Sequence, residues 1–233
     1  MQSKLIRTLI IYWKITMLKN YLLLPLSLAV LMFACVKEQD ESLQKRENEA
    51  SVSEKVDFKK IDNDRLKEWS DYYQTLDASF DLAKFQFQNL DTIRYIQGNV
   101  VGTFDASFNE IYKDFLIYSP DKKKYLDIDS YYWQEENGKA LFSPDQEINL
   151  VDLEKETVTR VDFNGPSLIV ESAFWIDNQT FFLLENSAED GPSPFIAEFD
   201  LANDLIKYYQ YADSVHIESK FTENKLKKKG IFL

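Results

Sequence analysis

Aromatic side chains are the most prominent residues of this sequence that could take part in ligand binding. The chain of 233 residues contains 4 Trp, 13 Tyr and 17 Phe. In the segment SYYWQ, strand geometry would place Tyr131 and Trp133 on one face and Tyr132 on the other. One face must join the core, and the other could present a flat ring to a sugar or a peptide. Tyr131 and Trp133 are therefore a candidate ligand platform, although most aromatic residues of a β protein simply fill its core.

Carboxylates supply a second candidate chemistry. Asp127 and Asp129 would lie on one face of a strand, as would Asp62 and Asp64. Neither pair is followed by the glycine and bidentate glutamate of an EF-hand calcium site, so we expect no metal ion and no other cofactor. Paired carboxylates can also hydrolyse a glycosidic bond when they lie about 5–10 Å apart across the sugar. With 39 acidic residues such a pair arises easily by chance, which leaves a glycan hydrolase as the alternative function.

His216 is the single histidine of the chain. Ser214 lies two residues before it, but the sequence has no G-x-S-x-G turn that would activate a serine. We therefore expect His216 to be an ordinary strand residue, and we predict no catalytic residue.

The first 34 residues have the composition of a secretory signal. They contain four basic side chains and no acidic one, and the fourteen residues Tyr21–Ala34 are uncharged. That run is shorter than the roughly 20 apolar residues that span a bilayer, and it suits the apolar region of a signal peptide. Met17 opens a short basic start followed by the apolar run, so Met17 is a candidate for the true start. The alternative is a membrane anchor over Leu5–Ala34, a stretch that Lys14, Lys19, Asn20 and Pro25 interrupt.

The one cysteine, Cys35, ends the segment MFAC. This segment resembles the lipobox of bacterial lipoproteins, with the small Ala34 before the cysteine and Met32 where that family usually has Leu. The resemblance implies that the signal is cut before Cys35 and that Cys35 carries a diacylglyceryl group and an acyl chain such as palmitate. Two or more chains hold a protein firmly on a membrane. The folded part would then contain no cysteine, which excludes disulfides and cysteine-based sites there.

Residues 35–56 are predicted to be a lipidated, flexible tether, because they carry polar and charged side chains and almost no apolar ones. Within them, Lys37–Glu41 (KEQDE) is similar to the lysine-plus-acidic tract that marks surface export in certain Gram-negative groups; an ordinary solvated linker explains it equally well. Removal of residues 1–34 leaves 23 basic and 39 acidic side chains, a net charge of −16. This acidity excludes a nucleic-acid partner and charge-driven adsorption to anionic lipid.

One helix is predicted over Ile61–Leu76, because apolar residues recur there at spacings of three and four. From Phe80 onward, aromatic and β-branched residues dominate between short polar turns, which predicts strands. Only six Gly and six Pro are present, so the turns must use Asp, Asn and Lys instead. The basic and then apolar end, Lys225–Leu233, is predicted to be an edge strand or a frayed tail. We therefore expect one domain, 57–233, that is mainly β: an antiparallel meander with one N-terminal amphipathic helix.

A strand pattern occurs twice within this domain. Leu116–Ile128 and Ser172–Leu184 each predict a strand, a turn and a strand. Ile148–Val161 and Phe195–Tyr209 each predict a hairpin with Asp-Leu before its turn, and the two Asp-Leu pairs lie 48 residues apart. The sequence therefore predicts an internal repeat.

The repeat resembles the four-stranded blades of TolB-type, WD40-like β-propellers, in which an aromatic-Ser-Pro-Asp-Gly-Lys turn precedes an Asp-Leu hairpin. Ser119, Pro120 and Asp121 keep the centre of that motif, and Lys122 replaces its glycine. The resemblance covers about residues 113–211 and implies blade-like sheets that form a partial propeller and contact another protein. The strands between Phe80 and Asp105 could supply part of a third blade. Closed propellers use about four to eight blades, so this chain is too short for one.

Together these features predict a lipid-anchored cell-envelope protein, attached to the outer membrane through Cys35 and facing the periplasm or the cell surface. Its expected role is non-catalytic binding or structural, with an envelope protein or a glycan as partner. The alternative is an envelope glycan hydrolase that uses paired carboxylates. A concave pocket with converging acids of perturbed pKa would favour the enzyme, and a shallow aromatic patch would favour the binding protein. An exposed apolar patch would favour a structural role in a larger assembly.

Overall fold

The computed structural model describes residues 56–188, 193–213 and 218–232 of the chain. These residues belong to a compact unit of residues 51–233. Cys35, the predicted signal peptide 1–34, the predicted tether up to residue 55 and His216 lie outside the described residues.

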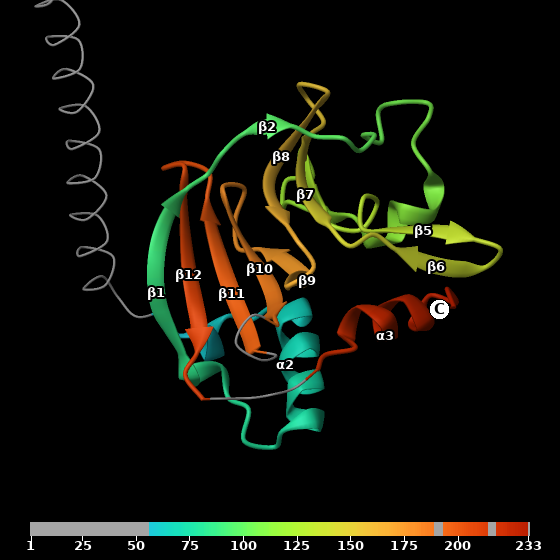
Figure 1. The fold of residues 1–233 in the computed structure, drawn as a ribbon. Helices are drawn as coiled ribbons and strands as arrows, with labels where there is room; N and C mark the ends of the chain where they lie inside the picture. The colour runs from blue at the N-terminus through green and yellow to red at the C-terminus, as the bar shows by residue number, and fades with distance from the viewer. Residues whose placement is uncertain (1–55, 189–192, 214–217, 233) are drawn as a thin grey trace, which may run out of the picture. The chain divides into compact units, whose positions relative to one another are not determined.

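The described residues form twelve strands, two α-helices and three 3-10 helices (Figure 1). The helices are η1 (Phe58–Lys60), α2 (Asp64–Leu76), η2 (Leu82–Lys84), η3 (Glu110–Phe115) and α3 (Phe221–Lys228). The strands are β1 (Phe85–Thr92), β2 (Ile96–Gln97), β3 (Ile117–Tyr118), β4 (Lys124–Asp127), β5 (Trp133–Glu136), β6 (Lys139–Phe142), β7 (Gln146–Asp152), β8 (Thr157–Asn164), β9 (Leu168–Trp175), β10 (Thr180–Ser187), β11 (Ser193–Asp200) and β12 (Leu205–Tyr211).

The strands form two five-stranded sheets and one hairpin, and all the pairs within them are antiparallel. The C-terminal sheet has the order β1-β12-β11-β10-β9, and the middle sheet has the order β2-β8-β7-β4-β3. The hairpin β5–β6 is inserted between β4 and β7. Each five-stranded sheet is therefore a four-strand meander to which one early strand has been added at the outer edge. Figure 1 shows the chain crossing from β1 on one sheet to β2 on the other.

This topology confirms a mainly β, antiparallel fold with a helix before the strands. The predicted helix is α2, and the Asn63 side chain caps it by accepting hydrogen bonds from the backbone N–H groups of Arg65 and Leu66, at 3.0 and 3.4 Å. The suggestion that residues 80–105 contribute to a third blade is wrong, because β1 and β2 complete the edges of the two existing sheets.

The two halves of the predicted repeat make equivalent turn contacts. Asp152 and Asp200 each accept hydrogen bonds at Oδ1 from two backbone N–H groups of the turn that follows, at 3.0–3.2 Å. The next residue, Leu153 or Leu201, donates its N–H at 2.9 Å to a carbonyl of the preceding hairpin turn. A carboxylate side chain thus closes each turn in the way that a backbone group would, which explains why Asp precedes these turns.

Lys122 has a backbone conformation that glycine would adopt more easily. It occupies the position at which the blade motif has glycine, and its backbone has φ 59°. Asn137, Glu156 and Asp204 also have positive φ, at 55°, 51° and 55°. A left-handed conformation costs a residue with a Cβ roughly 1 kcal/mol, so these turns carry local strain that glycine would relieve.

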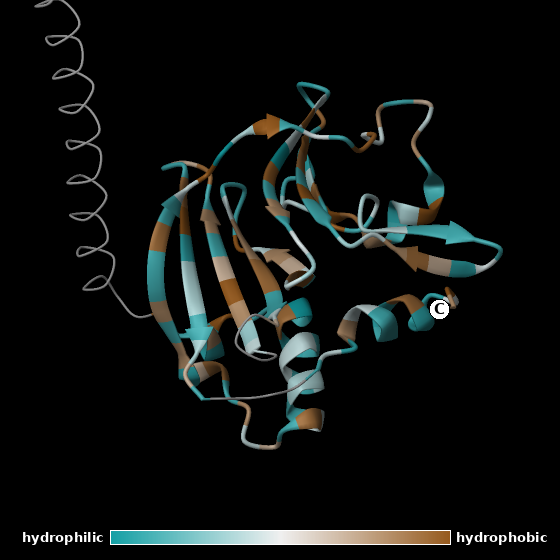
Figure 2. Ribbon diagram, in the orientation of Figure 1, coloured by the Kyte–Doolittle hydropathy of each residue, from teal (hydrophilic) through white to brown (hydrophobic). Residues whose placement is uncertain are grey.

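The C-terminal sheet is buried on both faces. On β10, Phe182 and Leu184 belong to a core cluster shared with α2, whereas Phe181 and Leu183 belong to a cluster shared with the middle sheet. Alternation along the strand therefore places every residue of the run FFLL in a core. Figure 2 shows apolar stretches along β10 and β11 and a hydrophilic β5. The order of layers is helix α2, C-terminal sheet, middle sheet.

The end of the chain differs from the prediction of an edge strand or a frayed tail. Residues 221–228 form α3, which buries Phe221 and Leu226. Phe232 then makes a single parallel bridge to Lys139 of β6. The run of lysines lies largely on the solvent side of this helix, with Lys225 turned inward as the exception.

Candidate functional site

Trp133, predicted as half of a ligand platform, is a core residue. It is 0% exposed, its ring packs against Tyr112 and Phe115, and its Nε1 donates to Asp129 Oδ1 at 3.0 Å. The chain makes a turn just before β5, with a hydrogen bond from the Trp133 N–H to the Asp129 carbonyl at 3.1 Å. Strand alternation therefore does not apply to residues 130–132, and the prediction of a platform is wrong for Trp133.

Tyr131 has a different environment. It is half-buried, and its ring lies beside that of Phe163, with the centroids 6.3 Å apart. Phe163 is 44% exposed, so this pair does present aromatic surface. A ligand-binding role for Tyr131 stays a prediction, with Phe163 as its neighbour in place of Trp133.

Asp127 and Asp129 are buried and have structural roles. Asp127 Oδ1 accepts the backbone N–H groups of Asp129 and Ser130 at 3.1 and 2.9 Å, which fixes the turn after β4. Burial raises the pKa of Asp127. Both carboxylate oxygens of Asp129 accept hydrogen bonds from Lys225 Nζ, at 2.9 and 3.0 Å. The two side chains therefore serve different partners and do not act as a pair.

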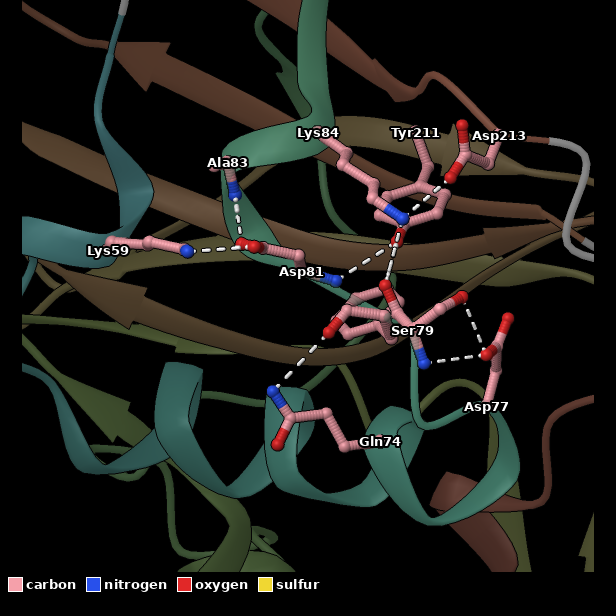
Figure 3. Close-up of polar contacts among 10 residues, drawn as sticks. Lys59, Gln74, Asp77, Ser79, Asp81, Ala83, Lys84, Tyr211 and Asp213 are labelled. Atoms are coloured by element: carbon pink, nitrogen blue, oxygen red, sulfur yellow. Dashed lines mark hydrogen bonds and ion pairs between the residues drawn. The ribbon is translucent and has the colours of Figure 1, made fainter.

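A polar cluster fixes the loop between α2 and β1 (Figure 3). The Tyr211 hydroxyl accepts the Asp81 N–H at 3.0 Å and donates to the Ser79 carbonyl at 3.4 Å. Lys84 Nζ donates to the same carbonyl at 2.9 Å and to Asp213 at 2.7 Å. Since each of these groups has a partner within the cluster, we interpret it as a structural latch between the loop and β12.

A hollow with a volume of about 620 Å³ lies between α2 and α3. Its charged walls pair with one another, as in Lys67–Asp71 at 2.5 Å and Lys228–Glu68 at 2.6 Å. These side chains are more than half exposed, and such pairs in water contribute little. We interpret this groove as a solvated seam between two surface helices.

A smaller cleft of about 310 Å³ lies where the outer strands of the two sheets face each other. The segment that crosses from β1 to β2 contributes to its wall (Figure 1). The polar and aromatic side chains of its lining are Asp91, Thr92, Arg94, Arg160, Asp162, Phe163 and Tyr208. Its volume is at the lower end of the range for small-molecule sites, and it combines apolar walls with a few polar groups as such sites do.

Tyr208 lies at the centre of the charges in this cleft. Burial raises the pKa of its hydroxyl, and the negative charges of Asp162, Glu185 and Asp91 raise it further, whereas Arg94 lowers it. Within the part of the chain that the structure describes, no hydrogen bond of this hydroxyl is found. The hydroxyl is therefore available to a ligand as both donor and acceptor.

Two of the three acids near Tyr208 have a raised pKa. Burial raises the pKa of Asp162, the Phe163 N–H opposes that shift at 2.8 Å, and Asp91 adds to it. Burial also raises the pKa of Glu185 well above its usual value, with Asp162 adding to the shift. Glu185 lies behind the lining, is 1% exposed and leaves Oε1 without a hydrogen-bond partner among the described residues.

The two arginines of the cleft are in different states. Arg160 Nη1 forms an ion pair at 3.0 Å with Glu147, whose side chain is 0% exposed, and its guanidinium lies 5.1 Å from the Phe163 ring centroid. Arg94 is exposed and forms no ion pair with the described residues. Arg94 can therefore offer its donors to a ligand, whereas Arg160 is held in place as part of the wall.

Comparisons with protein-family models, with curated proteins and with solved structures gave no match to this chain. Among the described residues, no helix has the length and apolar character that crossing a membrane requires.

Asp162 and Glu185 were not predicted from the sequence. Glu185 did carry a signal, because it follows two residues after Leu183 and so shares the inward face of β10. Asp162 carried no such signal. A bulge at Val161, opposite Ile148 and Asn149, shifts the register, so that Asp162 pairs with the inward-facing Ile148. No residue pattern in the sequence predicts that bulge.

Proposed function

We propose that this chain is a lipid-anchored protein of the bacterial cell envelope whose folded domain binds a glycan without catalysis. The observation that carries the proposal is the cleft between the two sheets, where Asp91, Arg94, Asp162 and Tyr208 face a common space. The anchor rests on the resemblance of MFAC to a lipobox, with Cys35 as the lipidated residue and the outer membrane as the site of attachment.

The chemistry of the cleft suits a ligand rich in hydroxyl groups. A sugar hydroxyl both donates and accepts, so it can accept from Arg94 while it donates to an aspartate. The Tyr208 hydroxyl can serve either need. The exposed ring of Phe163 offers an apolar surface for the C–H face of a sugar ring, and Tyr131 lies beside it.

The test is retention of the purified domain on insoluble bacterial peptidoglycan in a sedimentation assay. We expect Arg94→Ala to reduce the retained fraction several-fold, because it removes the unpaired donor of the cleft. Lys155→Ala is the matched control, since Lys155 is an exposed cation whose ion pair is with Asp152 in a turn. Equal retention of wild type and Arg94→Ala would contradict the assignment of the cleft.

The second candidate function is glycan hydrolysis, and the acids of the cleft favour it. An enzyme of this class requires a concave site with an acid of raised pKa, and Asp162, whose pKa burial raises, lines the cleft together with Asp91. We favour binding because Glu185, whose pKa is raised well above its usual value, is buried behind the lining, away from a bound sugar. Release of reducing ends from peptidoglycan by the wild type, and its loss in both Asp91→Asn and Asp162→Asn, would establish the enzyme instead.

We also propose that the two sheets are related to propeller blades. The support is that each sheet is built on a four-strand meander and that the Asp-Leu turns make the same contacts in both. Sheets built like propeller blades have loops at their edges, and the cleft lies at such edges.

A further inference from the structure

Glu185 is a buried acid whose hydrogen-bonding capacity is not used. It is 1% exposed, and its Oε1 has no partner within the described part of the chain. On β10 it lies two residues after Leu183, so its side chain points toward the middle sheet. Leu183, Ala197 of β11 and Tyr208 of β12 stand in one row across the sheet. Glu185 therefore lies next to this row of residues, and Tyr208, at the end of the row, lines the cleft.

Asp162 and Asp91 approach the same space from two other strands. Asp162 pairs with Ile148, a residue of the cluster between the sheets, so it points toward the C-terminal sheet. Asp91 pairs with the buried Ile206 on β12. Apart from the hydrogen bonds that each accepts from the following backbone N–H, at 2.8 and 2.7 Å, neither carboxylate has a partner among the described residues. Asp91 and Asp162 thus line the cleft together with Tyr208, each with acceptor capacity to spare, and the Glu185 carboxyl lies behind this lining.

The positive charges nearby do not balance these acids. Arg160 is neutralised by the buried Glu147. Arg94 is the one cation of the lining that is free of such a pair among the described residues. A ligand that fills the cleft would gain most from carrying a positive group toward the acids and hydroxyl groups toward Arg94.

We propose that the glycan bound in this cleft is an amino sugar, whose ammonium group lies between Asp91, Asp162 and the Tyr208 hydroxyl, with the buried Glu185 carboxyl behind them. This inference rests on the proposed glycan-binding function and specifies its ligand. An ammonium group has several N–H donors, and charge-assisted hydrogen bonds to carboxylates are about twice as strong as neutral ones. Among the described residues no group of three or more acids, histidines or cysteines could hold a metal.

Binding of a cation should release protons. Burial raises the pKa of both Asp162 and Glu185, so part of the acid cluster holds protons that an ammonium group would displace. We therefore expect affinity for an amino sugar to rise with pH as these carboxyl groups ionise. The titratable and charged groups that face the site are Asp91, Arg94, Arg160 with its partner Glu147, Asp162, Glu185 and Tyr208.

The test uses three β-1,4-linked trisaccharides that differ only in the group at carbon 2: those of glucose, N-acetylglucosamine and glucosamine. Binding to the purified domain is measured near neutral pH by titration calorimetry or by NMR. We expect the glucosamine trisaccharide to bind at least about tenfold more tightly than the other two, which is a difference of about 1.4 kcal/mol. Equal affinities for all three would overturn the amino-sugar inference and leave the glycan-binding proposal standing. Failure of all three to bind would overturn both.

Variants locate the preference within the cleft. Glu185→Gln and Asp162→Asn keep the shape of each side chain and remove its charge. We expect both to abolish the preference for glucosamine while affinity for the glucose trisaccharide stays within about twofold. Glu154→Gln is the control, because Glu154 is an exposed acid paired with Lys123 at the surface. Unaltered preference in both cleft variants, each shown to be folded by its circular dichroism and thermal transition, would overturn the inference.

Discussion

Among single residues, Glu171 has the charge state with the largest consequence for folding. It lies on β9 beneath α2, 3% exposed, and its Oε2 accepts hydrogen bonds from Trp69 Nε1 at 2.7 Å and the Tyr73 hydroxyl at 2.9 Å. Burial raises its pKa from 4.5 to about 7, although hydrogen bonds from Ser219, Trp69 and Tyr73 and the charge of Lys225 act in the opposite direction. The folded protein therefore holds this proton more tightly than the unfolded chain does.

This raised pKa makes stability depend on pH. Stability from the protonated Glu171 is fully present below about pH 4.5 and is lost as the pH rises to about 7. We expect Glu171→Gln to match the wild type near pH 5 and to exceed it above pH 7 by about 3 kcal/mol, because it stays neutral. Urea unfolding at both pH values measures this difference. Glu68→Gln, on the exposed side of α2, is the control, and a Glu171→Gln protein whose advantage does not change with pH would contradict the interpretation.

Single residues also show what the sequence could predict. The Asp-Leu pairs at Asp152 and Asp200 were predictable, because their role is local and the side chain closes its own turn. The burial of Trp133 was not predictable, because a turn of four residues before β5 interrupts the alternation of the strand. The orientation of Asp162 depended on a bulge at Val161 in its own strand β8, which is a property of the pairing with β7 and not of the local sequence.

At the scale of elements, α3 is attached through an inward-facing lysine. Lys225 Nζ bonds both oxygens of Asp129 and also the Glu171 carbonyl, at 3.4 Å. The side chains of Lys225 and Asp129 are 19% and 3% exposed. The same helix carries Lys228, whose pair with Glu68 is exposed. One helix thus contains a buried and a surface ion pair that can be compared directly.

We expect Lys225→Met to lower the free energy of unfolding by about 3 kcal/mol, because it removes the ion pair of the buried Asp129 carboxylate and leaves only the charge of Arg65 near it. Lys228→Met should change it by no more than about 0.5 kcal/mol, because its pair is solvated. Denaturant unfolding of both variants supplies the comparison. Similar losses in the two would show that α3 is held by apolar contacts such as Leu226 alone.

Gln146 joins the two sheets. Its Nε2 donates to the carbonyls of Ile128 and Val170, at 2.9 and 3.0 Å, and its Oε1 accepts the Val170 N–H at 2.8 Å. It lies on β7 of the middle sheet, whereas Val170 lies on β9 of the C-terminal sheet. A single buried amide therefore satisfies three backbone groups across the junction.

Replacing this amide should destabilise the domain. We expect Gln146→Leu to cost about 2 to 4 kcal/mol, because three buried backbone groups lose their partners. Gln86→Leu, on an exposed position of β1, should change stability by no more than about 0.5 kcal/mol. Thermal or urea unfolding measures the stability of the two variants. Near-equal effects would mean that water replaces the lost partners at the junction.

Whether most elements are helices or strands could be predicted from the sequence, but which strands pair with one another could not. The spacing of apolar residues gave α2, and the aromatic and β-branched stretches gave the strands of both meanders. The pairings β1–β12 and β2–β8 connect residues more than 60 positions apart, and periodicity carries no information on them. The end of the chain, Lys225–Leu233, was predicted to be an edge strand or a frayed tail, because the helix depends on burying Leu226 together with Phe221, which lies before that segment.

For the whole molecule, the cleft depends on how the two sheets meet. Asp91 and Tyr208 come from the edge of one sheet, whereas Arg160 and Asp162 come from the edge of the other. The sequence contained all of these residues, yet no local pattern links them. The proposed site is therefore a product of the tertiary fold, and the proposed location of the protein is a product of its first 35 residues.

The central claim is that this domain works at the membrane surface of the cell envelope, and the most direct measurement is the intact mass of the protein from membrane fractions of a bacterial host. We compare the wild type with Cys35→Ala. We expect the wild type to lack residues 1–34, to carry a diacylglyceryl group and an acyl chain on Cys35, and to partition into detergent, whereas Cys35→Ala is unlipidated and leaves the membrane. A wild-type protein without lipid mass, or one that fractionates in the same way as Cys35→Ala, would contradict the claim.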